Sequence, residues 1–212
     1  MTQNLWLFLL SAAGISLSGV MLPGPLTAAT IAKGYDDRNA GAMIGIGHGI
    51  VEIPMIALIY FGFASYLENP TVKMVTALAG GAMLIVMGLL IFFTFKKPVE
   101  GASVIPYSPL VTGIVMTGGN PYVFLWWATI GVALITGAIV FGIIGLVLFA
   151  VVHLACDIAW EQVVSMTVFR TRHLWTPRAQ KIVFGVCAVV LIGFGTWYAV
   201  SVFYEQASAV LT

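Results

Sequence analysis

The sequence contains six apolar segments, each long enough to cross a lipid bilayer as a helix. About 20 apolar helical residues span the roughly 30 Å of hydrocarbon in a membrane. The segments run approximately over residues 4–33, 41–66, 72–95, 108–136, 138–166 and 180–204. Because only 8% of the residues are charged, no polar stretch is long enough to fold separately. We therefore expect an all-α integral membrane protein that forms one domain over residues 1–212.

Glycine and proline interrupt two of these segments. Pro23, Gly24 and Pro25 break the first segment, and a Gly-Gly-Asn-Pro sequence ending in Asn120 and Pro121 breaks the fourth. Neighbouring helices can satisfy the backbone groups freed by a simple kink. Two breaks at corresponding places instead favour discontinuous helices, whose exposed amides and carbonyls bind polar groups. Asn120 would add a side-chain amide to such a site.

A histidine precedes a carboxylate by four residues twice in otherwise apolar segments. The pairs are His48 with Glu52 and His153 with Asp157, and both members are displaced by the same 105 residues. On a helix this spacing places both side chains on one face. An unpaired charge near the bilayer centre costs a few kcal/mol. We therefore expect each of these carboxylates to have a partner or access to water.

The two pairs together predict a polar site near the middle of the membrane. Such a site could hold protons, a cation or the ammonium group of a substrate. Two imidazoles and two carboxylates could also ligate a transition metal. A purely structural alternative is that His48 and His153 donate to the carboxylates and help the helices to pack.

The segments form two similar units of three. Gly80 and Gly88 in the third segment correspond to Gly185 and Gly193 in the sixth, again at an offset of 105. The units cover about 4–95 and 108–204, and a cytoplasmic connection covers about 96–107. Because three is odd, the second unit enters the membrane from the opposite side. This inverted repeat is typical of secondary transporters, with alternating access around a site between the halves.

The basic residues lie mainly in one set of connections. Lys73 is the single basic residue on the other side. Lys and Arg are retained on the cytoplasmic side, so we expect a multi-pass protein of the cytoplasmic membrane with both termini outside. The other eight basic residues are Lys33, Arg38, Lys96, Lys97, Arg170, Arg172, Arg178 and Lys181.

Three further polar or aromatic side chains have two interpretations each. Glu161 follows Asp157 by one turn and could pass protons towards the cytoplasm, or it could simply approach the charged interface. Trp126 and Trp127 could shape a substrate pocket or pack in the core, where their indole N–H groups need partners.

Several classes of protein are excluded by missing patterns. No phosphate-binding loop ending in Gly-Lys-Ser or Gly-Lys-Thr occurs, and no serine or cysteine nucleophile stands beside a base. The dispersed basic residues suit anionic lipid better than nucleic acid. We expect no enzymatic activity, no cofactor and no nucleic-acid partner.

Three motifs together resemble the lysine exporter (LysE) family of translocators. They are the Pro-Gly-Pro of residues 23–25, the Gly-His of residues 47–48 and the Asn-Pro of residues 120–121. The stretches that begin at Asn120 and His153 look like a prokaryotic, often archaeal, branch of the family. The resemblance covers almost the whole chain.

This resemblance implies a six-helix exporter of amino acids or related small solutes, driven by an ion gradient and assembled as a homodimer. Amino-acid efflux members often carry Asp or Asn directly after Pro-Gly-Pro, whereas this chain has Leu26. A divalent metal cation therefore stays open as the alternative substrate, with His48, Glu52, His153 and Asp157 as its ligands.

Overall fold

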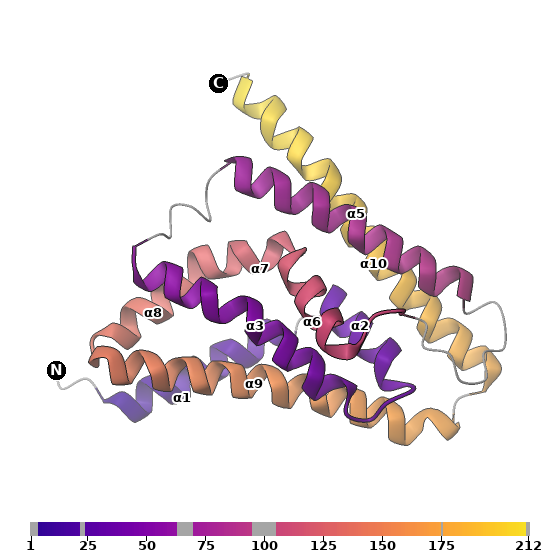
Figure 1. Cartoon of the computed structure of the whole chain (residues 1–212), viewed down its shortest axis with the longest axis horizontal. Coiled ribbons are helices and arrows are strands. Elements are labelled where there is room, and N and C mark those ends of the chain that lie inside the picture. The colour runs from indigo at the N-terminus through magenta and orange to yellow at the C-terminus, as the bar shows by residue number, and fades with distance from the viewer. Residues whose placement is uncertain (1–3, 22–23, 63–69, 95–104, 175, 211–212) are drawn as a thin grey trace.

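The structure is a computed structural model that describes residues 4–21, 24–62, 70–94, 105–174 and 176–210. All regular structure in these ranges is helical (Figure 1). The helices are α1 (Leu5–Val20), α2 (Pro25–Gly34), α3 (Ala40–Tyr60), α5 (Pro70–Thr94), α6 (Pro109–Gly118), α7 (Pro121–Trp126), the π-helix η1 (Trp127–Gly131), α8 (Val132–Ile139), α9 (Gly142–Thr171), the short 3-10 helix η2 (Arg172–Leu174) and α10 (Pro177–Val210).

Each of the six predicted apolar segments contains helix, which confirms the all-α class. Within the described ranges, three stretches are long and apolar enough to cross a membrane, namely Ala40–Tyr60, Tyr122–Ile139 and Gly142–Leu174. Helices α1 and α2, bent by 76° at the break between them, would together make a fourth. The chain therefore has membrane-spanning helices, while the total of six spans stays a prediction.

Both predicted interruptions coincide with helix ends. Helix α1 ends at Val20 and α2 begins at Pro25, whereas α6 ends at Gly118 and α7 begins at Pro121. A proline at the first helical position has a suitable fixed φ and no N–H to leave unpaired. The Asn120 side chain accepts a hydrogen bond of 3.0 Å from the Tyr122 amide and so caps α7. Local sequence thus explains why two new helices start at these points.

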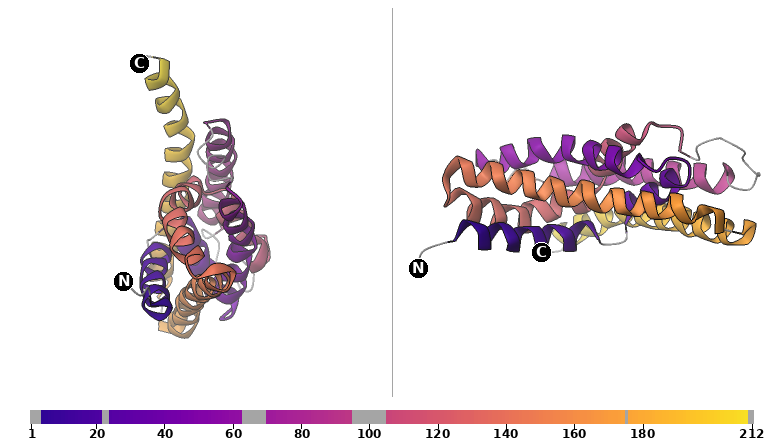
Figure 2. Two further views of the ribbon diagram at one scale, coloured as in Figure 1. Left: turned by 90° about the vertical axis from the view of Figure 1, so that its left-hand side faces the viewer. Right: turned by 90° about the horizontal axis from the view of Figure 1, so that it is seen from below.

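Helix α3 packs against both α6 and α9, and α1 lies along α9 (Figure 1). Helices α5 and α10 lie side by side and form a second group that meets α2 (Figure 2). Close approach depends on glycine where α3 crosses α6. A Cβ atom at Gly113 would collide with the carbonyl oxygen of Ile44, and one at Gly47 with that of Leu110. Small residues allow this backbone contact between membrane helices.

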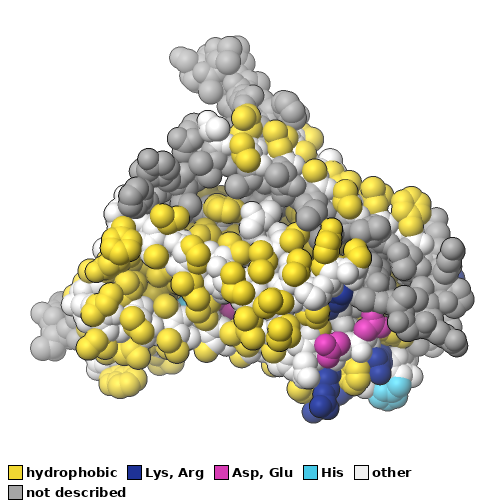
Figure 3. Space-filling model, in the orientation of Figure 1, with side chains coloured by type: hydrophobic (Ala, Val, Ile, Leu, Met, Phe, Trp, Pro, Cys, Tyr) yellow, Lys and Arg dark blue, Asp and Glu magenta, His cyan; other side chains and the backbone are white. Residues whose placement is uncertain are grey.

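The buried apolar side chains form two clusters. One cluster joins α2, α5, α6 and α10 around residues such as Met116 and Leu191. The other joins α1, α3, α9 and the α7–α8 region around Trp127 and Phe149. Much of the visible surface is also apolar, and charged side chains gather near the C-terminal end of α9 (Figure 3). Such a surface suits contact with lipid.

Candidate functional site

Four ionisable side chains meet where α3 crosses α9. His48 and Glu52 come from α3, and His153 and Asp157 come from α9. We call these four residues the central tetrad. Each is buried, with an exposed fraction of 7% or less. The two predicted pairs are therefore brought together into one cluster.

Short distances between imidazole nitrogens and carboxylate oxygens connect α3 and α9 within the tetrad. His48 Nε2 lies 3.1 Å from Glu52 Oε1 and 3.9 Å from Asp157 Oδ2. His153 Nε2 lies 3.3 Å from both Glu52 Oε2 and Asp157 Oδ2. Each imidazole thus faces a carboxylate of its own helix and one of the other helix. When an imidazole is protonated, its positive charge therefore lies between two acids that would otherwise repel one another.

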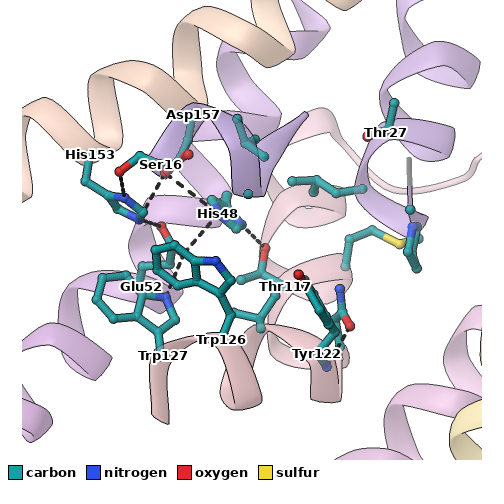
Figure 4. Close-up of a pocket in the computed structure, with 18 of the residues that line it drawn as sticks. Ser16, Thr27, His48, Glu52, Thr117, Tyr122, Trp126, Trp127, His153 and Asp157 are labelled. Atoms are coloured by element: carbon teal, nitrogen blue, oxygen red, sulfur yellow. Dashed lines mark hydrogen bonds and ion pairs between the residues drawn. The ribbon is translucent and has the colours of Figure 1, made fainter. Parts of the chain in front are cut away.

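Each imidazole also contacts a hydroxyl group, which comes from α6 for His48 and from α1 for His153. Thr117 Oγ1 on α6 lies 2.7 Å from His48 Nδ1, and Ser16 Oγ on α1 lies 2.7 Å from His153 Nδ1 (Figure 4). These contacts leave both Nε2 atoms directed at the carboxylates. Orientation of one ring nitrogen by a hydrogen bond at the other is a common way to fix a functional histidine.

The hydrogen bonds of Thr117 also locate a proton. Its hydroxyl donates to the Gly113 carbonyl at 2.7 Å, so it accepts from His48 Nδ1–H. The His48 Nε2 atom then faces Glu52 Oε1 at 3.1 Å. Two bare acceptors at that distance would repel, and a proton must therefore lie between His48 and Glu52.

Two tryptophans complete one wall of the site. The Trp127 indole donates to Glu52 Oε1 at 2.8 Å, and the Trp126 ring stacks on His153 with ring centres 5.5 Å apart. Trp127 is fully buried. Both tryptophans therefore contact tetrad residues directly and line the cavity described below, while a role in shaping a substrate pocket stays a prediction.

Hydrogen-bonding capacity is left over within the tetrad. Glu52 Oε2, His153 Nε2 and Asp157 Oδ2 are buried yet make no hydrogen bond of acceptable geometry within the described part of the chain. Buried polar atoms nearly always have partners. Polar atoms that lack a hydrogen-bond partner and lie beside a cavity are available to bind a ligand.

A cavity of about 350 Å³ opens beside the tetrad. All four tetrad residues line it, together with residues from both helix breaks, Gly24, Pro25 and Asn120. Its other walls are largely apolar and include Leu26, Met116, Val123 and Phe194. The volume and the mixture of apolar walls with a few polar groups are typical of a small-molecule site.

The remaining predicted site residues lie elsewhere. Glu161 is buried one turn beyond Asp157 and does not line the cavity. Pro121 begins α7, and Pro23 lies outside the described residues. The functional roles predicted for all these residues stay predictions.

A cation could be held by part of the tetrad. One potential ligand atom from each of His48, Glu52 and Asp157 lies within 4.8 Å of the others. Histidine and carboxylate together suit several divalent metals. The same three groups could equally bind a substrate ammonium group, so the donor set alone does not select between these ligands.

Two contacting residues, Ser16 and Thr117, escape prediction from the sequence. Ser16 lies nine residues before Pro25, whereas Thr117 lies four before Pro121. These unequal spacings do not follow the internal offset that relates the two histidines. A hydroxyl residue in the last turns before each break is the one signal that could indicate them.

Comparison with known proteins adds one finding. The model of the LysE type translocator family matches residues 17–201, a range that contains the whole tetrad and both helix breaks. No curated protein and no solved structure gives a significant match to the chain.

Proposed function

We propose that this chain, which belongs to the LysE type translocator family, is a secondary active exporter of amino acids or related small solutes. The observation that carries the proposal is the meeting of four buried ionisable side chains with both helix breaks at one cavity. Charged groups deep in a membrane protein usually mark a transport pathway. The protein would carry its substrate across the cytoplasmic membrane without converting it.

The tetrad would bind the cationic part of the substrate and exchange protons with it. Glu52 and Asp157 supply negative charge, and His48 and His153 share the protons that balance it. Spare capacity at Glu52 Oε2 and Asp157 Oδ2 would be used by a substrate ammonium group. Arrival of that cation would displace a proton from the tetrad, which gives a chemical basis for coupling to a proton gradient.

The first helix break would bind the other end of an amino acid. Helix α2 begins at Pro25, its N-cap residue Gly24 has no side chain to cap the first turn, and Gly24, Pro25, Leu26 and Thr27 line the cavity. The N-terminus of a helix carries partial positive charge and favours anions. In transporters, such half-helix ends often face the anionic group of a substrate.

An inverted repeat would explain how the site opens to both sides in turn. The cross-contacts support this, because α1 of the first half holds His153 of the second, and α6 of the second half holds His48 of the first. Glu52 and Asp157 likewise come from different halves. Rocking of residues 4–95 against residues 108–204 would then expose the tetrad alternately. We place both termini outside and expect a homodimer.

A screen of ligand-induced thermal shifts tests the proposal. Amino acids and divalent cations are added separately to the purified protein, and specific binding raises the melting temperature. We expect an amino acid to stabilise wild type but not Glu52→Gln. Absence of any amino-acid shift in the wild type would count against amino acids as substrates.

The second candidate is transport of a divalent metal cation, supported by the closeness of His48, Glu52 and Asp157. The same screen separates the two candidates. A metal substrate predicts a shift with a divalent cation that is lost in His48→Ala, with no shift from any amino acid. The proposal of amino-acid export predicts a shift with an amino acid and no shift with a divalent cation.

A further inference from the structure

Glu161 forms a buried acidic site that is separate from the cavity. Glu161 is 0% exposed and follows Asp157 by one turn of α9. Among the described residues, neither carboxylate oxygen makes a hydrogen bond of acceptable geometry or takes part in an ion pair. A carboxylate in such a place differs from those of the tetrad, each of which has an imidazole within 4.0 Å.

Two polar neighbours of Glu161 on α9 already have hydrogen-bond partners elsewhere. Gln162 Oε1 accepts from the Ala42 amide, and Ser165 Oγ accepts from the Gly41 amide at the start of α3. The Thr30 hydroxyl on α2 lies close to the Glu161 carboxylate. It is 0% exposed and makes no hydrogen bond of acceptable geometry within the described chain. Glu161 and Thr30 thus form a pair of buried polar groups between α2 and α9 with unused capacity.

The charged groups on the surrounding helices make no ion pair with Glu161 within the described chain. Helices α1 and α8 contain no charged residue, and the Nζ atom of Lys33 on α2 donates to the Ile105 carbonyl at 2.6 Å. The other ionisable groups on the packed elements are engaged in the tetrad or lie near the end of α9. These groups are His48 and Glu52 on α3, His153, Asp157 and Arg170 on α9, and Arg172 and His173 on η2.

The energetics of burial select the neutral form of this side chain. An isolated ionised carboxylate is too costly to hold in an apolar interior, and such a group takes up a proton instead. A metal cation would need several more oxygen ligands than Glu161 and Thr30 provide. One bound proton satisfies the site without any further ligand.

We propose that Glu161 is a proton-carrying site, distinct from the substrate cavity, that couples export to a proton gradient. The inference rests on the proposed transport function and assigns substrate binding and proton storage to two separate sites. The tetrad binds the substrate and exchanges protons with it, while Glu161 holds a further proton enclosed between α2 and α9. Export would require the α2–α9 contact to open so that this proton can leave or return.

Infrared spectroscopy of the full chain in proteoliposomes tests whether Glu161 is protonated. The probe is the carbonyl-stretch band of a carboxylic acid at neutral pH, compared between wild type and Glu161→Gln. We expect one such band in the wild type that the variant loses. Glu161→Asp should move the band without removing it, which decides the question even if Glu161→Gln fails to fold. An unchanged band in both variants would overturn the proposal.

Transport measurements on the same vesicles test whether this proton moves. A mixture of the proteinogenic amino acids is the substrate, and an internal pH dye follows protons. We expect Glu161→Gln to exchange amino acids without a gradient but to lose its response to a pH gradient. The matched change Glu52→Gln should instead lose exchange itself. A full response to the pH gradient in Glu161→Gln would refute the proton-carrying role of Glu161. Absence of amino-acid exchange in the wild type would instead refute the transport proposal, and the infrared result alone would then decide whether Glu161 is protonated.

Discussion

His48 shows how much of the site is set by residues that surround the tetrad. Its Nδ1 atom is held by Thr117 at 2.7 Å, its Nε2 atom faces Glu52 at 3.1 Å, and Glu52 in turn accepts from Trp127. A chain of hydrogen bonds therefore runs from α6 through the tetrad to η1. Members of such a network strengthen one another and fix one arrangement of protons.

Replacement of Thr117 by valine should destabilise the protein. The change keeps the shape of the side chain but leaves His48 Nδ1 without its partner, at a cost of about 1–3 kcal/mol. Unfolding of the purified protein in detergent gives the free energy. Thr112 is the matched control, because its buried hydroxyl donates to the carbonyl of Ser108, the N-cap residue of α6. Equal losses in Thr112→Val and Thr117→Val would show that the histidine contact contributes nothing.

The sequence predicts the four tetrad residues because spacing along a helix is a local property. His48 and Glu52 share a face wherever the helix goes, and the offset of 105 relates them to His153 and Asp157. The partners behind the imidazoles depend on how helices cross. Ser16 lies 137 residues from the histidine that it contacts, and no local rule connects residues at that distance.

At the scale of the elements, proline and glycine indicate where helices start and stop. Both predicted breaks are found, because a proline at the first position of α2 or α7 favours a new helix and disfavours continuation of the old one. The π-helix η1 that follows α7 was not predicted. A π-helix differs from an α-helix by one hydrogen-bond register, and an apolar sequence carries no pattern that separates the two.

The close crossing of α3 and α6 predicts a strong effect of Gly113→Ala. The added methyl group would collide with the Ile44 carbonyl oxygen, so the helices must separate and move His48 away from Thr117. We expect a loss of about 1–3 kcal/mol, the usual cost of overpacking. Gly118→Ala is the control, since its Cβ would meet no described atom within 4 Å outside its own stretch of helix. Measurement of both unfolding free energies would contradict the account if the two variants were alike.

Loss of the cap on α7 should affect both stability and binding. Asn120→Ala removes the hydrogen bond to the Tyr122 amide, at about 0.5–2 kcal/mol. Because Asn120 also lines the cavity, we expect its loss to reduce the ligand-induced thermal shift. Ser108→Ala removes a comparable cap from α6, at Val111, on an exposed residue. If both variants bound ligand as the wild type does, Asn120 would have only a capping role.

For the molecule as a whole, the sequence predicts which segments span the membrane but not how the helices pack against one another. Apolar periodicity does not distinguish the faces of helices that are apolar all round. The division into two apolar clusters, with the cavity between Met116 of one and Trp127 of the other, therefore emerges only in three dimensions. The ionisable pairs at residues 48–52 and 153–157, together with the two helix breaks, were the signals that could indicate the centre.

The central claim is that the tetrad binds the substrate and takes part in its coupling to protons. Counterflow of labelled amino acids in proteoliposomes, with and without an imposed pH gradient, tests it most directly. We predict that the gradient accelerates uptake by the wild type, and that Glu52→Gln and Asp157→Asn abolish uptake and with it this acceleration. Uptake that ignores the gradient in the wild type and is unchanged in both variants would contradict the claim.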